Sequence, residues 1–236
     1  MPHPLRIETS LHATKNLVHA AKRLTRASGA DDSQRMAALR IYDLLTPEAL
    51  QRYARFMADT YDLVYVTDEQ QGPKEALRKA VKSIRPDMDP DAYLQRWAFT
   101  LGNLVWLPFS LERPESKPLW PLYWQFITIA HETVHRVQCK THEMAPFAWD
   151  YLTNEESRGQ YEYEAYRVAL ELYPAIMGGA QLDPATLAEP LVQYGLSPST
   201  IAFVVQQLTI VQQIIRNGGI VSEVSQRTLR WFADNL

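Results

Sequence analysis

The chain has 236 residues, and its 24 basic and 27 acidic side chains give a formal net charge of −3, which argues against a general nucleic-acid binder. Hydrophobic residues make up 46% and charged residues 22% of the chain, which is typical of a folded globular protein and argues against a disordered one. The single cysteine, Cys139, excludes an intramolecular disulfide and a cysteine-rich zinc module.

Membrane and export signals are not evident in the sequence. The first 30 residues lack the apolar run and small-residue cleavage pattern of a signal peptide. The uncharged segment 118–130 is too short to cross a bilayer, and segment 191–215 carries glutamines beside an apolar stripe with helical spacing. We therefore expect a soluble, cytoplasmic protein without a membrane span.

Helix signals dominate the N-terminal part of the chain. Helix-forming residues predict helices over 10–27 and 31–45. The run Thr46-Pro47-Glu48 is typical of a helix start, with a threonine cap, proline at the first helical position and an acid in the first turn. Residues 62–67 are rich in β-branched and aromatic side chains and predict a short strand. Residues 73–85 predict a basic amphipathic helix, whose charged face we interpret as solvated.

The C-terminal part begins with a different pattern. Residues 97–110 predict a strand or hairpin around Gly102, and an apolar helix is expected over about 122–140. Further helices are predicted at 155–173, 184–194, 198–217 and 222–235. The sequence thus predicts a predominantly helical α+β fold with a small sheet, in which an N-terminal helical portion over 1–95 packs on a core over 96–236.

Residues 131–135 read His-Glu-Thr-Val-His, an HExxH motif. Histidines four positions apart lie on one face of a helix, so the imidazoles of His131 and His135 can reach one Zn²⁺. Glu132 projects beside that face, where it can take a proton from a water whose pKa the metal lowers to about 7. The motif therefore indicates a hydrolytic zinc site.

A zinc site of this kind needs a third protein ligand. The residues that follow do not complete an HExxHxxGxxH pattern, and His142 is expected to point away along the chain. A carboxylate is left, and four glutamates are candidates: Glu155, Glu156, Glu162 and Glu164.

The combination of HExxH with a later Glu-x-x-Ala resembles the glutamate-type zincin metallopeptidases, the gluzincins. More narrowly, it is similar to uncharacterised bacterial and phage zincin-like proteins. The shared features are Thr100-Leu101-Gly102 with Leu107-Pro108, the HExxH motif with Gln138, and the run EYEAYR over 162–167. The resemblance covers about residues 98–170, and it implies a zincin-like catalytic core, a Zn²⁺ cofactor and cleavage of peptide bonds.

The resemblance favours Glu162 as the third ligand, because the ligand glutamate of the pattern has a small residue three positions later and Ala165 stands there. Glu155 and Glu164 each have an arginine at that position, although Glu155 remains an alternative. Glu162 and Glu164 are two apart on a helix and cannot both bind one ion. Glu164 could instead support the metal ligands or be solvated, and we favour a solvated side chain.

Two residues depart from the zincin pattern. Arg136 directly follows the second histidine, where the pattern usually has an uncharged residue. Asn154-Glu155 imitates the ligand motif of thermolysin-type enzymes, but Gly159 replaces the aspartate that would steady the histidine.

Tyr166 lies four positions after Glu162 and shares its face, so it is a candidate to hydrogen-bond a ligand histidine or the oxyanion of the reaction. Tyr151, Tyr161 and Tyr163 compete for that role. Cys139 is interpreted as a small buried hydrophobic residue.

The sequence thus favours a zinc-dependent hydrolase, and most of all a metallopeptidase with Glu132 as general base and a peptide or protein as substrate. A strand near 99–107 would line the cleft, where an extended peptide can pair with it. Two alternatives are a non-enzymatic interaction or virion-type structural protein that retains a zincin fold, and a metal-dependent hydrolase of a non-peptide bond.

Overall fold

The computed structural model describes residues 41–236 apart from 68, 85 and 114–119. The helix predicted over 10–27, and residues 31–40 of the one predicted over 31–45, lie outside this part of the chain. The described chain is predominantly helical with one small sheet, which confirms the predicted fold class. In chain order the elements are η1 (Ile41–Leu44), α3 (Pro47–Tyr61), β1 (Val64–Val66), α4 (Gln71–Ile84), α5 (Pro90–Leu94), β2 (Phe99–Leu101), β3 (Leu104–Trp106), α6 (Leu122–His142), α7 (Met144–Thr153), α8 (Glu155–Ile176), α9 (Pro184–Ala188), η3 (Glu189–Tyr194), α10 (Pro198–Arg216) and α11 (Glu223–Asn235).

Helix α3 begins where its sequence signals predicted. The Thr46 hydroxyl accepts the Ala49 N–H at 3.1 Å, and Pro47 occupies the first turn. One face of α3 is buried in the main core, with Leu50, Tyr53 and Met57 fully enclosed. This face packs on α6 and places α3 beside the helix that carries the HExxH motif.

The sheet has three short strands in the order β1-β3-β2. Strands β2 and β3 form the predicted hairpin, and Gly102 turns it with φ +66°, a conformation that favours glycine. Strand β1 pairs with β3 in parallel, which the sequence did not predict. Strand β2 therefore lies at an edge of the described sheet, and it also contacts α6.

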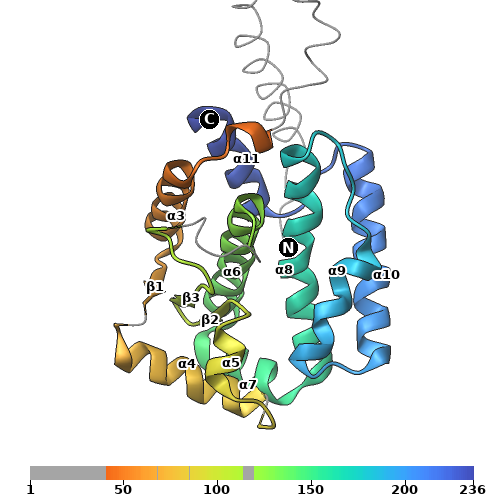
Figure 1. Ribbon diagram of the computed structural model, residues 1–236. Helices are drawn as coiled ribbons and strands as arrows, with labels where there is room; N and C mark the ends of the chain where they lie inside the picture. Colours follow the sequence, from red (N-terminus) through yellow and green to blue (C-terminus); the bar gives the residue numbers. More distant parts are fainter. Residues whose placement is uncertain (1–40, 68, 85, 114–119) are drawn as a thin grey trace, which may run out of the picture.

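Helices α6 and α8 run side by side through the middle of the molecule, with α10 outside α8 and α3 on the other flank (Figure 1). Helix α11 contacts both α6 and α8. The core between these helices is apolar and fully enclosed at Phe126, Ile129, Val168, Leu172, Val204 and Leu208. Burying one such side chain contributes about 1.5–3 kcal/mol, so this core fixes how α6 and α8 cross.

Helices α8 and α10 approach closely at their N-terminal ends. A Cβ added at Gly159 would stand 2.5 Å from the Thr200 Cγ2 atom, so a larger residue would force the Thr200 side chain or the helix to shift. The Thr200 hydroxyl donates to Glu155 at 2.6 Å, and the Ser197 N–H donates to the same carboxylate oxygen at 2.6 Å. Gly159 thus has a packing role here, and Glu155 caps α10.

A second carboxylate of α8 holds α11 in the same way. Glu171 is 1% exposed and accepts the backbone N–H groups of Val221 and Ser222. Burial raises the pKa of Glu171, while Arg167 and these N–H groups act in the opposite direction. Helix α8 therefore anchors two later helices through carboxylates that are not part of the HExxH cluster.

No helix of the described residues is long and apolar enough to cross a membrane.

Candidate metal centre

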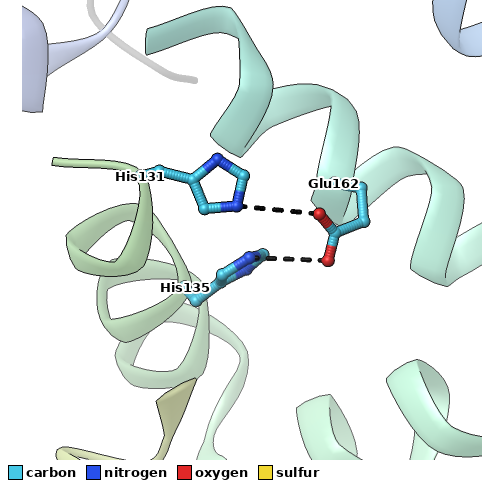
Figure 2. A group of neighbouring side chains, drawn as sticks. All are labelled: His131, His135 and Glu162. Atoms are coloured by element: carbon cyan, nitrogen blue, oxygen red, sulfur yellow. Dashed lines mark ion pairs between the residues drawn. The ribbon is translucent and has the colours of Figure 1, made fainter. Parts of the chain in front are cut away.

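The two histidines of the HExxH motif lie one above the other on α6, with ring centroids 5.0 Å apart. Helix α8 passes alongside and brings Glu162 to the same point (Figure 2). The His131 Nε2 atom lies 3.7 Å from Glu162 Oε2, and the His135 Nε2 atom lies 3.5 Å from Glu162 Oε1. One ligand atom from each of the three residues lies within 4.8 Å of the others. This cluster can hold a metal ion.

The surroundings of the cluster fit a cation. The Glu162 side chain is fully buried, and its Oε2 atom has no hydrogen-bond partner among the described residues. Burial lowers the pKa of His131 well below its usual value, so this imidazole is neutral and free to act as a ligand. Ligand atoms around a tetrahedral ion are about 3.4 Å apart, close to the two distances observed. The charge of a divalent ion would compensate the negative charge of the buried Glu162 carboxylate, whose burial without a partner costs free energy.

The other carboxylates considered as third ligands lie elsewhere. Glu155 caps α10, and Glu164 accepts hydrogen bonds from Gln138 and Gln160 at 2.9 and 3.3 Å. Ala165 is fully buried, so the position three residues after Glu162 holds a small side chain inside the helix packing. Of these glutamates, the structure places only Glu162 against the histidines.

Gln138 fixes the orientation of His135, a role that the sequence did not reveal. Its amide nitrogen donates to the Tyr161 carbonyl and to Glu164, both at 2.9 Å. Its amide oxygen therefore faces His135 and accepts from the Nδ1 atom at 2.9 Å. His135 therefore carries a proton on Nδ1, and its Nε2 atom points toward Glu162 Oε1. Glu164, for which the sequence favoured a solvated side chain over a supporting role, thus steadies the histidine through Gln138.

Glu132 is 3% exposed and lies on α6 beside the histidine face. The Thr100 hydroxyl of β2 donates to Glu132 Oε2 at 2.7 Å. Burial raises the pKa of Glu132 to about 7, with the nearby Glu162 adding to the rise and His135 and Thr100 opposing it. The hairpin thus positions a carboxyl group that can both accept and release a proton near neutral pH.

Three tyrosines surround the cluster. The Tyr151 hydroxyl donates to Glu162 Oε1 at 2.5 Å, and the Tyr166 ring meets the His131 ring edge-on at 4.8 Å. The Tyr166 hydroxyl is hydrogen-bonded to Tyr194, and no bond from it to a ligand histidine is present among the described contacts. Burial raises the pKa of all three phenols, so they remain protonated donors.

Tyr194 was not identified from the sequence. It belongs to η3, far along the chain from the HExxH motif, and one tyrosine among 12 carries no distinguishing signal. Tyr151 was one of the tyrosines that the sequence offered as alternatives to Tyr166. Helix α7 positions it, and the Arg158 Nη1 atom donates to the Tyr151 carbonyl at 2.7 Å, which holds the last turn of this helix.

Two hollows meet at Glu132. The smaller is lined by residues that include Thr100, His135, Tyr151 and Tyr194. The larger has a volume of about 300 Å³, and His131, Glu132 and Tyr166 are part of its wall. Glu132 is therefore part of the walls of both hollows.

Other residues of interest on α6 point elsewhere. Arg136 donates to the Tyr61 carbonyl and to Asp62 at the end of α3, which explains a charged residue directly after His135. Cys139 is 2% exposed within an apolar cluster, as predicted. The ring of His142 packs on Tyr161, outside the histidine–glutamate cluster.

Comparisons of the chain with protein-family models, curated proteins and solved structures found no match. The case for a metal centre at His131, His135 and Glu162 therefore depends on the geometry of the cluster itself.

Proposed function

We propose that this protein is a zinc-dependent hydrolase, most specifically a metallopeptidase with a zincin-like core. The observation that carries the proposal is the buried cluster of His131, His135 and Glu162 with Glu132 beside it at the edge of a cavity. Open catalytic sites of this composition are typical of hydrolytic zinc enzymes.

The donor set favours Zn²⁺ as the resident ion. Two imidazole nitrogens and one carboxylate suit zinc better than magnesium or calcium, which prefer oxygen ligands alone. A bound zinc ion would polarise a carbonyl oxygen and make hydroxide available near neutral pH. His131, His135 and Glu162 would hold it, with Gln138 orienting His135 and Tyr151 orienting Glu162.

Glu132 is proposed to move the proton during hydrolysis. The oxygen of water forms a bond to the carbonyl carbon, and its proton passes to the Glu132 carboxylate. As the carbon–nitrogen bond breaks, Glu132 gives this proton to the leaving amine, which leaves a carboxylic acid and an amine as products. Thr100 holds Oε2 of Glu132, and no hydrogen bond to the other oxygen is present among the described residues, so that oxygen can take part in this exchange. Tyr166 and Tyr194 share a hydrogen bond, so one of their two hydroxyl protons is left as a nearby donor for the developing negative charge.

A peptide is favoured as substrate by the position of β2. This strand lies at the edge of the described sheet, and two of its residues, Phe99 and Thr100, line the smaller hollow next to Glu132. An extended peptide can add to such an edge through backbone hydrogen bonds, which would lay its carbonyl groups along the site.

Replacement of Glu132 tests the proposal most directly. Glu132→Gln is expected to bind zinc within about threefold of the wild type, since this side chain is not a ligand. The variant should lose about 10²–10⁴-fold in kcat on a peptide-library substrate, because it cannot exchange a proton. Glu143→Gln, at the exposed end of the same helix, is the matched control and should keep full activity.

The alternatives give different results. Zinc binding without cleavage of any peptide, amide or ester by the wild type would favour a non-enzymatic role. Cleavage of esters alone, lost in Glu132→Gln, would assign the site to a non-peptide bond. Equal activity of Glu132→Gln and the wild type would refute the role of Glu132.

A further inference from the structure

Helix α10 lies on the outside of α8 and exposes a row of apolar side chains (Figure 1). Phe203, Ile210 and Ile214 are 43%, 48% and 40% exposed. They are seven and four positions apart, so they lie within about 40° of one another around the helix, over a length of about 17 Å. We call these three residues the α10 stripe. The buried side of the helix is separate, since Val204 and Leu208 are fully enclosed in the main core.

No charged side chain interrupts this face of α10. Segment 198–215 contains no aspartate, glutamate, lysine or arginine, and Arg216 is the first charged residue of the helix. Surface helices usually carry charged residues on the side that faces the solvent. A helix that exposes aligned apolar side chains and no charge there has the character of an interface.

The polar residues beside the stripe suit contact with an identical surface. Gln206 and Gln213 are exposed and lie on one flank of the stripe. Each glutamine amide is both a donor and an acceptor, so it can pair with the same kind of side chain on another molecule. A charged residue at these positions would instead face a like charge across a twofold axis.

The charge of the rest of the chain favours this face for contact between two copies. Residues 41–236 carry 17 basic and 24 acidic side chains, so two copies of this part repel each other wherever charged surfaces meet. The α10 stripe avoids that repulsion. It suits other occupants less well, because residues 1–40, with seven basic and three acidic side chains, would find no acidic residue on this face. A helix that binds anionic lipid carries several basic residues, whereas α10 has Arg216 alone.

We propose that α10 of one copy packs antiparallel on α10 of a second copy, about a twofold axis. Phe203 and Ile214 are equally far along the helix from a point between Leu208 and Thr209. An axis at this point places Phe203 of each copy against Ile214 of the other, with Ile210 close to the axis. A stripe about 17 Å long on a helix about 10 Å wide covers less than the roughly 800 Å² per partner of a standard interface, so we expect a Kd of about 1–100 μM.

Sedimentation velocity of the 236-residue protein between about 1 and 500 μM tests the proposal. The mass should rise with concentration from 27.1 kDa toward twice that value. Ile210→Glu brings two carboxylates together near the axis and should raise the Kd at least about tenfold. Val64→Glu is the matched control, because Val64 is 39% exposed on β1, at the opposite flank of the molecule from α10, and the charge change is the same (Figure 1).

A charge-swapped pair tests whether the contact is symmetric. Ile210→Lys alone should stay monomeric at concentrations where the wild type associates, as Ile210→Glu does. An equal mixture of the two variants should associate again, because a lysine of one copy then lies near a glutamate of the other. Restored association would also show that both variants are folded.

Three results would overturn the inference. The first is a wild type that stays monomeric up to 500 μM, which would leave the stripe to another occupant. The second is equal association of Ile210→Glu and Val64→Glu. The third is a mixture of the charge-swapped variants that stays monomeric, which would refute the twofold arrangement. Each result is read without metal or substrate, so it is independent of the proposed hydrolase.

Discussion

Replacing Gln138 with leucine perturbs the centre without touching a metal ligand. The wild-type amide accepts from His135 Nδ1 and is itself fixed by Tyr161 and Glu164, all at 2.9 Å. Leucine has nearly the same volume but offers no acceptor. Gln138→Leu should therefore leave the helix in place and free the imidazole to turn or to change tautomer.

The size of the effect follows from these contacts. Loss of a hydrogen bond that orients a ligand histidine typically costs 10–100-fold in metal affinity, which corresponds to about 1.4–2.7 kcal/mol. In the metal-free protein, the Nδ1–H of a ring that is only 6% exposed loses its acceptor. That loss should lower the free energy of unfolding by about 1–3 kcal/mol.

Competition with a fluorescent zinc chelator at pH 7 measures the affinity, and urea unfolding of the metal-free protein measures the stability. Gln160→Leu is the matched control, because Gln160 also donates to Glu164 but does not contact His135. Equal zinc affinities for Gln138→Leu and Gln160→Leu would refute the orienting role of Gln138.

Three further predictions concern the scaffold. Gly159→Ala should lower the free energy of unfolding in urea by about 1–2 kcal/mol despite the better helix propensity of alanine, because the new Cβ would meet a methyl group of α10 at 2.5 Å. The control Gly72→Ala adds a Cβ with nothing within 4 Å and should raise that free energy by up to about 1 kcal/mol. Equal effects of the two variants would contradict this packing. Hydrogen bonds from Ser197 and then Thr200 lower the pKa of Glu155 from 4.5 to about 2, so its stabilisation is complete above pH 4.5 and is lost as the pH falls toward 2. The Tm gap between wild type and Glu155→Gln should therefore close over this range, because the protonated acid resembles the amide; a gap that does not vary with pH, or an equal gap for exposed Glu156→Gln, would contradict the cap. Burial raises the pKa of the Cys139 thiol, so an aromatic disulfide reagent should label it at least about 100-fold more slowly in the native protein than in urea, and fast native labelling would show that it is accessible.

The elements that the sequence predicted best carry local signals. The Thr46-Pro47 start of α3 and the glycine-centred hairpin lie where the residues indicated. Helix α5 has the same kind of start, an Asp89 cap followed by Pro90, but it is only a short turn that was not predicted. Helix α7 begins directly after Glu143, which has positive φ and makes no side-chain cap bond, so no residue pattern indicated where this helix starts.

Some residues of the candidate site could likewise be predicted from local signals in the sequence, and others could not. Helical periodicity alone places His131 and His135 on one face. The resemblance to the zincin pattern favoured Glu162 over Glu155, because the small residue Ala165 stands three positions after Glu162. Gln138 and Tyr194 could not be assigned, because their roles depend on how α8 and η3 pack against α6 and each other. Such contacts join residues distant in the chain, and the hydrogen bonds that identify them appear only when the helices are assembled.

An anomalous-scattering map at the zinc edge, from crystals of the protein reconstituted with zinc, tests the central claim most directly. We predict a single strong peak about 2.0–2.2 Å from the Nε2 atoms of His131 and His135 and from a carboxylate oxygen of Glu162. A map without a peak at this cluster, or with the ion bound by other residues, would contradict the proposed metal centre.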